Sequence, residues 1–180
     1  MKKLLLLAIC LLVLPHLVAA QGVKLGAGVF GGMEVPVIQD DQSSGSNFGF
    51  KGRVNVALIT FEPYLSFASY GGADIEDVID DPDGNSITGF GLDAVLFSGF
   101  GAPGPRMILF AGIGSYKVKN DQMDYDQSNI GYSFGLGLEI GVARGINIEG
   151  RGRFLAIGTD GGATKKSAIV TAGLNYHFGM

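Results

Sequence analysis

The chain has 180 residues and a formal net charge of −4, and 17% of its residues are charged, against roughly 25% in a typical soluble domain. This acidic balance argues against a nucleic-acid partner. Glycine is abundant at 30 residues and tryptophan is absent, while mean hydropathy is positive. No apolar run is long enough for a membrane helix, so the composition indicates one domain built as a membrane sheet.

Residues 1–20 have the features of a secretory signal peptide. Two lysines precede an apolar run over residues 4–14, and small residues occupy positions 18–20. The run is shorter than the roughly 20 residues of a transmembrane helix, so cleavage after Ala20 is expected and residues 21–180 form the mature domain. Cleavage removes Cys10, which is the only cysteine, and two lysines. The mature chain then has 11 basic residues (13 minus 2) against 17 acidic ones, a net charge near −6, and no disulfide.

Alternation of large apolar residues with small or polar ones predicts β-strands. The clearest case runs from Asn129 to Gly141, where every even position is large and apolar. Its length suits the roughly 9–11 residues of a tilted membrane-spanning strand. The predicted strands are residues 23–35, 47–58, 62–70, 87–98, 106–116, 129–141, 146–156 and 167–178.

The predicted connections alternate between long and short. Long ones rich in Gly, Asp, Asn and Ser fall near residues 36–46, 71–86, 117–128 and 157–166, and short ones near 59–61, 99–105 and 142–145. Outer-membrane barrels have short periplasmic turns and longer external loops. The pattern therefore predicts an all-β fold, an eight-stranded antiparallel up-and-down transmembrane β-barrel, with both termini on the periplasmic side.

Each predicted strand has an apolar and a polar row. In residues 47–58 the apolar row includes Phe48 and Phe50 and the polar row includes Lys51 and Arg53. Because the polar rows are rich in glycine and poor in charge, we expect the apolar rows to face lipid. A soluble periplasmic lipocalin-like carrier would reverse the faces and is the alternative. Three tyrosines near strand ends fit an interfacial girdle, although the first also fits the interior: Tyr64, Tyr132 and Tyr176.

The inward rows hold eight ionisable residues, which must pair with one another or meet water. They are Lys51, Arg53, Glu62, Asp93, Glu139, Glu149, Arg151 and Arg153. One interpretation is a salt-bridge plug, and the other is a narrow hydrophilic pore. An eight-stranded barrel is just wide enough for side chains to fill, which favours the plug. Five small inward residues are expected to make room for the Arg and Lys stems: Gly89, Gly91, Gly135, Gly137 and Gly173.

The signal peptide, the eight strands and the closing segment from Gly173 to Phe178 resemble the small outer-membrane β-barrel family of the OmpX, Ail and OmpA transmembrane-domain type, especially its Bacteroidota members. The resemblance implies residence among outer-membrane lipids and lipopolysaccharide. It also implies that an aromatic terminal strand, here with Tyr176 and Phe178, is recognised by the outer-membrane assembly machinery. Two residues follow Phe178, which departs from the family pattern.

Catalytic motifs are absent from the sequence. The mature chain has one histidine, His177, at the end of the last predicted strand, and no zinc-ligand, Walker or Gly-x-Ser-x-Gly pattern. A catalytic base must reach its nucleophile, so we expect His177 to pack in the interior or at the rim of the lower turn. We expect the chain to be neither an enzyme nor dependent on a cofactor.

The second long loop is acidic and contains no basic residue. Oxygen ligands at alternating positions suit a hard cation such as calcium, but Leu92 stands where a helix-loop-helix calcium site needs glutamate. A solvated loop and a cation site, including one that bridges to lipopolysaccharide phosphates, both remain open. The candidate ligands are Asp77, Asp80, Asp81, Asp83 and Asn85.

Together these features predict a monomeric, non-enzymatic outer-membrane barrel with a filled lumen, contributing to envelope integrity or to surface contact through its loops. Three alternatives remain: an adhesin or receptor for an extracellular ligand, acting through the acidic loop and the loop 117–128; a narrow pore; and the periplasmic carrier. The members of the family that the chain resembles include structural barrels, adhesins and factors that resist host defence.

Overall fold

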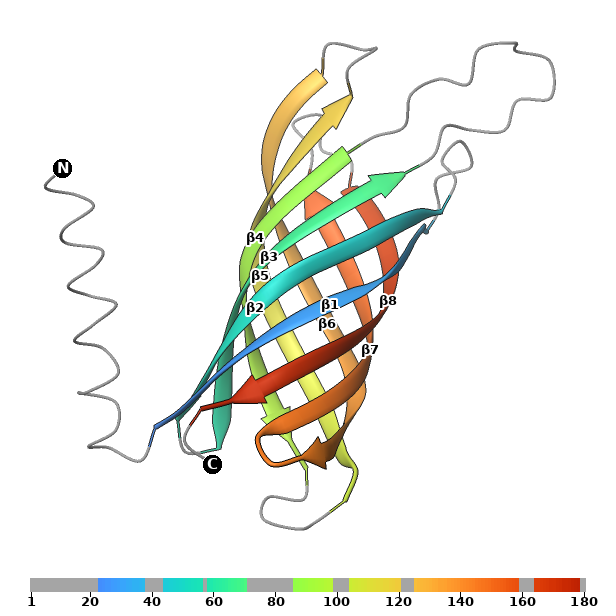
Figure 1. The fold of residues 1–180 in the computed structure, drawn as a ribbon. Helices are drawn as coiled ribbons and strands as arrows, with labels where there is room; N and C mark the ends of the chain where they lie inside the picture. The colour runs from blue at the N-terminus through green and yellow to red at the C-terminus, as the bar shows by residue number, and fades with distance from the viewer. Residues whose placement is uncertain are drawn as a thin grey trace, which may run out of the picture.

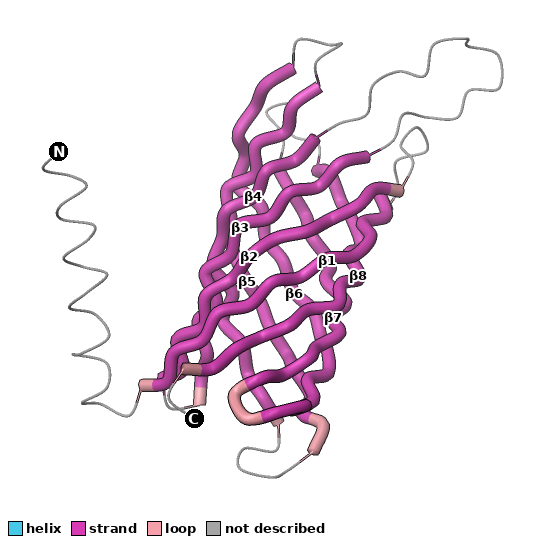
Figure 2. Tube along the Cα trace, viewed as in Figure 1, coloured by secondary structure: helices cyan, strands magenta, loops and turns pink. Residues whose placement is uncertain are grey.

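A computed structural model describes residues 23–37, 44–56, 58–70, 86–98, 104–120, 125–158 and 164–178. These residues form eight strands and no helix (Figures 1 and 2). The strands are β1 (Lys24–Pro36), β2 (Gly45–Val56), β3 (Ile59–Tyr70), β4 (Ser86–Phe97), β5 (Arg106–Asn120), β6 (Tyr125–Ala143), β7 (Ile146–Gly158) and β8 (Thr164–His177).

Each strand pairs antiparallel with its neighbours in the chain, and β1 pairs with β8 to close the barrel. The closing register places Val29 opposite Leu174 and Gly26 opposite His177. Full closure leaves no strand edge along the wall. An open sheet in lipid would leave the backbone donors and acceptors of its edge strands unpaired. The predicted fold class is therefore confirmed.

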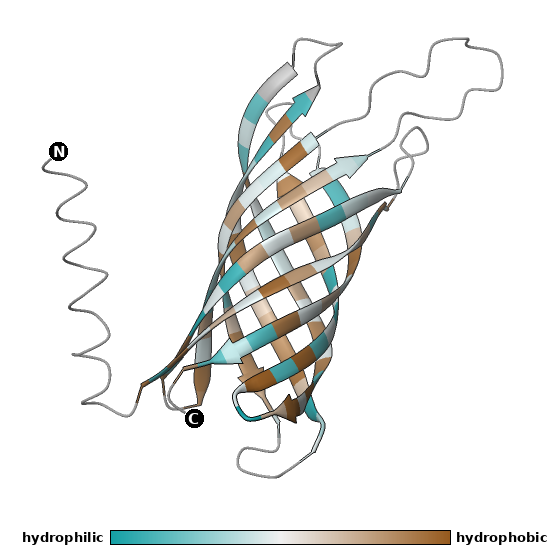
Figure 3. Cartoon of the chain, in the orientation of Figure 1, coloured by the Kyte–Doolittle hydropathy of each residue, from teal (hydrophilic) through white to brown (hydrophobic). Residues whose placement is uncertain are grey.

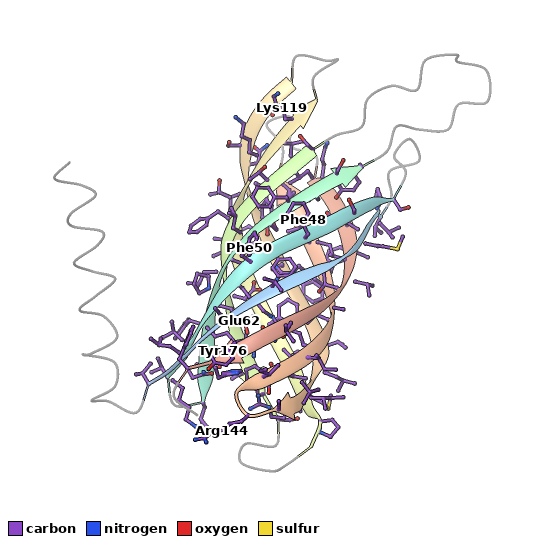
Figure 4. The ribbon with its side chains drawn as sticks, in the orientation of Figure 1. Phe48, Phe50, Glu62, Lys119, Arg144 and Tyr176 are labelled. Atoms are coloured by element: carbon purple, nitrogen blue, oxygen red, sulfur yellow. The ribbon has the colours of Figure 1, made fainter. Side chains whose placement is uncertain are left out.

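Burial alternates along the strands with the period of 2 that the sequence predicts. In β4 every second residue is buried, from Ile87 to Phe97. The exposed rows are apolar: Phe90 is 65% exposed and Leu136 66%. Figure 3 shows hydrophobic and hydrophilic residues alternating along the strands, and Figure 4 shows Phe48 and Phe50 on the wall with Glu62 among the strands. The predicted lipid-facing rows are thus on the outside.

The two ends of the barrel differ. At the terminal end, where Lys24 and His177 lie, β6 and β7 are joined by a two-residue turn over Arg144 and Gly145. Gly145 has φ of +74°, a left-handed conformation that glycine adopts without strain. At the opposite end, β5 and β6 run past the other strands and form an extended hairpin (Figure 1). We call this end the hairpin end, and Lys119 marks it in Figure 4.

This hairpin corrects the predicted third loop. Residues 117–128 were expected to form a long loop, but residues 117–120 and 125–128 are strand, and only 121–124 connect them. The alternation of apolar with polar residues did not predict these strand residues, because a strand that projects beyond the membrane needs no apolar face. The short turn expected near residues 59–61 is present but lies at residues 57–58, because β2 ends at Val56 and β3 begins at Ile59. The connection between β4 and β5 spans residues 98–105, so long and short connections do not alternate strictly.

Candidate functional site

All eight predicted lumen charges lie on the inward rows of their strands and are shielded from solvent. They come from five strands: β2 carries Lys51 and Arg53, β3 Glu62, β4 Asp93, β6 Glu139, and β7 the remaining three, which are Glu149, Arg151 and Arg153. Charges that are far apart in sequence are thereby brought into one narrow interior.

Arg53 is the centre of the largest cluster, and its side chain is fully buried. Its Nε lies 2.7 Å from Oε1 of Glu62, and its NH2 nitrogen donates to Oε2 of Glu149 at 2.7 Å. Its other terminal nitrogen donates to Glu139. One guanidinium therefore serves three carboxylates from three strands, a fork geometry that arginine supplies and lysine does not.

Arg151 and Lys51 complete this cluster. Arg151 contacts Oε2 of Glu62 at 2.7 Å and Oε2 of Glu149 at 2.9 Å through separate nitrogens. Lys51 pairs with Glu149, and its Nζ lies 3.6 Å from Oε2 of Glu62. Glu62 and Glu149 thus each contact the same three cations. Such shared pairing is how a narrow interior can hold ionised groups without isolating any of them.

A second, separate pair joins β7 to β4. Arg153 contacts Oδ2 of Asp93 at 2.5 Å and lies over the ring of Tyr64 at 4.7 Å from its centroid. The Tyr64 hydroxyl is 2.5 Å from that of Tyr116. Tyr64 is 4% exposed, so its assignment to an interfacial girdle is wrong and the inward alternative is correct. Tyr132 and Tyr176, by contrast, face outward at 64% and 49% exposure.

Two charged residues of the interior, Arg106 and Glu34, were not predicted. Arg106 pairs with Glu139 and lies over the Phe97 ring at 4.8 Å, while Arg53 lies over the same ring at 5.4 Å. Glu34 is also buried, at 1% exposure. The alternation of apolar and polar residues did not reveal Glu34 or Arg106. Glu34 lies on β1, which has glycines on both faces, and Arg106 is the first residue of β5.

Apolar residues also fill the interior, although only small and polar inward rows were expected. One buried cluster lies toward the hairpin end and consists of Ala68, Tyr70, Ile87, Tyr116, Val118, Leu155, Ile157 and Ile169. Another lies toward the terminal end and consists of Val95, Phe97, Ile108 and Phe110. Phe97 and Phe110 of the second cluster pack directly against the arginines, with the Arg53 guanidinium over the Phe97 ring and that of Arg151 over the Phe110 ring.

The predicted small inward residues make room mainly for rings. A Cβ atom at Gly89 would lie 2.7 Å from Cε1 of Tyr116, and one at Gly135 would lie 2.5 Å from Cζ of Phe110. Tyr64 occupies the space beside Gly91 in the same way. Of the five predicted glycines, only Gly137 makes room for an arginine stem, that of Arg151, and Gly173 faces Glu149. The expectation that all five accommodate Arg and Lys stems is therefore wrong.

His177 packs inside the barrel at the terminal end, as predicted. It is 4% exposed, and its Nδ1 lies 3.5 Å from the side-chain nitrogen of Asn147, which donates to Glu139. Among the described residues, no group of three or more His, Cys, Asp or Glu side chains could hold a metal ion. The candidate cation ligands Asp77, Asp80, Asp81, Asp83 and Asn85 lie outside the described residues, as does the predicted signal peptide.

The predicted assembly signal lies on the outer face of the closing strand. The rings of Tyr176 and Phe178 meet edge to face with centroids 5.2 Å apart. The backbone nitrogen of Phe178 donates to the carbonyl of Leu25 at 2.8 Å, which extends the pairing between the first and last strands. The recognition of this segment by assembly machinery stays a prediction.

A closed sheet that exposes apolar rows and encloses ion pairs and packed rings defines an integral β-barrel of a membrane. The family of outer membrane protein β-barrel domains matches residues 4–178 of the chain. The chain belongs to this family and is a protein of the bacterial outer membrane. The soluble periplasmic carrier is thereby excluded. Among the described residues no helix is long and apolar enough to span a membrane.

Solved structures show the same fold at low sequence identity. Neisserial surface protein A is 16% identical with a TM-score of 0.62, over 86% of this chain and 96% of that one. The N-terminal β-barrel domain of Pseudomonas aeruginosa OprF is 17% identical with a TM-score of 0.54, over 85% and 97%. Yersinia pestis Ail in a phospholipid nanodisc is 15% identical with a TM-score of 0.50, over 86% and 99%. No curated protein matches the chain.

Proposed function

We propose that this protein is a non-enzymatic, non-conducting barrel that acts at the cell surface through the hairpin of β5 and β6. The observation that carries the proposal is the hairpin itself, which extends the barrel wall beyond the other strands. One structural neighbour, Neisserial surface protein A, is by its name a surface protein as well.

Packing inside the barrel supports the absence of conduction. Three carboxylates, Glu62, Glu139 and Glu149, are each held by at least two cations. Moving an ion past them would require breaking buried pairs, each costing about 3–5 kcal/mol when one partner is left alone. The packed cluster toward the hairpin end adds a second barrier, because its buried side chains narrow the lumen.

Conduction is tested in a planar lipid bilayer. The purified unmodified protein should insert without producing a steady ion current. A stable conductance of reproducible size from the unmodified protein would overturn the closed lumen and favour the narrow pore.

The hairpin offers a backbone edge for contact. In β6, pairing with β7 begins at Gly131, opposite Ile157, whereas pairing with β5 continues up to Tyr125. The ladder of β6 with β5 therefore extends six residues beyond its ladder with β7. The projecting hairpin is a two-stranded ribbon, to which an extended segment of another molecule can add as a further strand.

The side of the membrane that bears the hairpin is tested by single cysteines, since the predicted mature chain has none. Ser128 is exposed on the hairpin and Ser98 is exposed at the terminal end. Ser128→Cys should react with a membrane-impermeant maleimide on intact cells. Ser98→Cys is the matched control and should react only after the outer membrane is permeabilised. The reverse pattern would contradict the proposal.

A shortened hairpin separates surface contact from envelope integrity. Val118 belongs to the buried apolar cluster and lies directly opposite Gln127, so residues 119–126 can be replaced by a two-residue Asn-Gly turn that keeps Val118 and does not change the register. In cells that lack the protein, this variant should restore exclusion of a fluorescent dye but not attachment to surfaces or to other cells. If the shortened variant restores both properties as well as the parent does, the hairpin has no role in surface contact.

A further inference from the structure

A small cavity lies inside the barrel, between the ion pairs and the apolar cluster of the hairpin end. Its volume is about 20 Å³, and polar side chains from five strands line it together with apolar ones. The polar lining residues are Glu34, Asn47, Tyr64, Ser66, Tyr116 and Arg153. A polar cavity of at least 10–15 Å³ can hold one water molecule, whereas apolar cavities of that size stay dry.

Asn47 gives the cavity an unsatisfied acceptor. This residue is 6% exposed, and its side-chain nitrogen donates to Oε2 of Glu34 at 2.9 Å. Its Oδ1 atom is buried and has no hydrogen-bond partner among the described residues. An unpaired buried acceptor costs about 1–3 kcal/mol, so this atom needs a donor that the described side chains do not supply.

Glu34 differs from the other buried carboxylates. It accepts from Asn47, from Ser167 at 2.6 Å and from the hydroxyl of Tyr70, all of which are neutral groups. Among the described residues it has no lysine or arginine partner. A buried carboxylate without a counter-charge gains from every additional hydrogen-bond donor in its surroundings.

The tyrosine pair supplies the complementary group. Tyr64 and Tyr116 share one hydrogen bond, so one of the two hydroxyl hydrogens is used and the other is left to donate elsewhere. The cavity therefore presents an unfilled acceptor at Asn47 and an available donor from the tyrosine pair. A ligand that donates and accepts at once fits this combination.

We propose that the cavity binds one ordered water molecule, which donates to Oδ1 of Asn47 and accepts from the hydroxyl pair of Tyr64 and Tyr116. The Arg153 guanidinium also lines the cavity, and its charge disfavours a metal cation there. The bound water connects Glu34 and Asn47 on one side of the lumen with the tyrosines and Arg153 on the other. Two otherwise separate hydrogen-bond groups thereby become one continuous network.

The test is nuclear magnetic resonance of the isotope-labelled protein in lipid nanodiscs. The side-chain amide protons of Asn47 should show a dipolar cross-peak to water in the rotating frame, where dipolar contact and hydrogen exchange have opposite signs. Ala68 lines the cavity, so Ala68→Val should fill it and remove this cross-peak. Ala94→Val adds the same atoms on the lipid-facing row of β4 and should leave the cross-peak unchanged.

Two results would overturn the proposal. The first is the absence of a water cross-peak from Asn47 in the folded parent protein, a measurement that does not depend on how any variant folds. The second is a shift of the Asn47 amide signals that follows the sodium concentration at constant ionic strength, which would assign the cavity to a cation.

Discussion

Replacing Glu62 by glutamine should strongly destabilise the barrel. Glu62 contacts Lys51, Arg53 and Arg151, all with side chains that are 5% exposed or less. The cluster around it holds four cations, counting Arg106, and three carboxylates. Glu62→Gln leaves four cations against two carboxylates and turns an amide N–H₂ group toward the guanidinium groups. Removing one partner of a buried pair typically costs about 3–5 kcal/mol, and glutamine adds no cavity to this cost.

Glu34→Gln is the matched control, since Glu34 is equally buried but bonded to neutral donors. The Glu34→Gln variant should lose only roughly 0.5–1.5 kcal/mol of its free energy of unfolding, which is the contribution of one ordinary hydrogen bond. The double variant Glu62→Gln, Arg53→Met has three cations and two carboxylates in the cluster, which is the same excess of one positive charge as in the parent. It should therefore recover part of the free energy of unfolding that Glu62→Gln loses. A free energy of unfolding for Glu62→Gln equal to that of Glu34→Gln would refute the reasoning.

The measurement is urea-induced unfolding in lipid vesicles. Because the chain has no tryptophan, the folded fraction is followed by circular dichroism and by the gel mobility of unheated samples. A closed barrel keeps its compact form until its pairing is broken as a whole, so folded and unfolded chains separate on the gel.

Two further predictions use the same assay. Leu136→Arg places a charge on an exposed apolar position near the middle of β6, so it should cost about 2–4 kcal/mol, and a loss near zero would contradict the lipid-facing assignment. Gly135→Ala should destabilise the barrel because its Cβ would meet the Phe110 ring, whereas Gly150→Ala, with no atom within 4 Å of the added Cβ, should be neutral or stabilising by about 0.4–1 kcal/mol. Equal effects of the two alanines would contradict the packing described for the interior.

The sequence predicted the strand faces where alternation was uninterrupted, as in β2 and β7, and therefore placed Arg53 and Arg151 correctly. It did not predict Glu34, because glycines at positions 26, 28, 31 and 32 occupy both faces of β1 and remove the contrast between them. The sequence also did not predict which charged residues pair with one another. Arg53 and Glu139 are 86 positions apart, and their contact depends on the tilt and register of every strand between them.

The separation of these ion-pair partners along the chain also affects how the barrel assembles. The bonds from β2 to β6 and β7 join residues 86 to 98 positions apart, so no hairpin of neighbouring strands contains a complete charge cluster. Arg53 and Glu62 pair between the neighbouring strands β2 and β3, whereas the bonds from β2 to Glu139 and Glu149 form only when distant strands meet. A partly assembled sheet in the bilayer therefore leaves arginines and glutamates incompletely paired, at a cost of several kcal/mol for each charge exposed to lipid. Ion pairing thus acts as a checkpoint that disfavours stable barrels with missing or misordered strands.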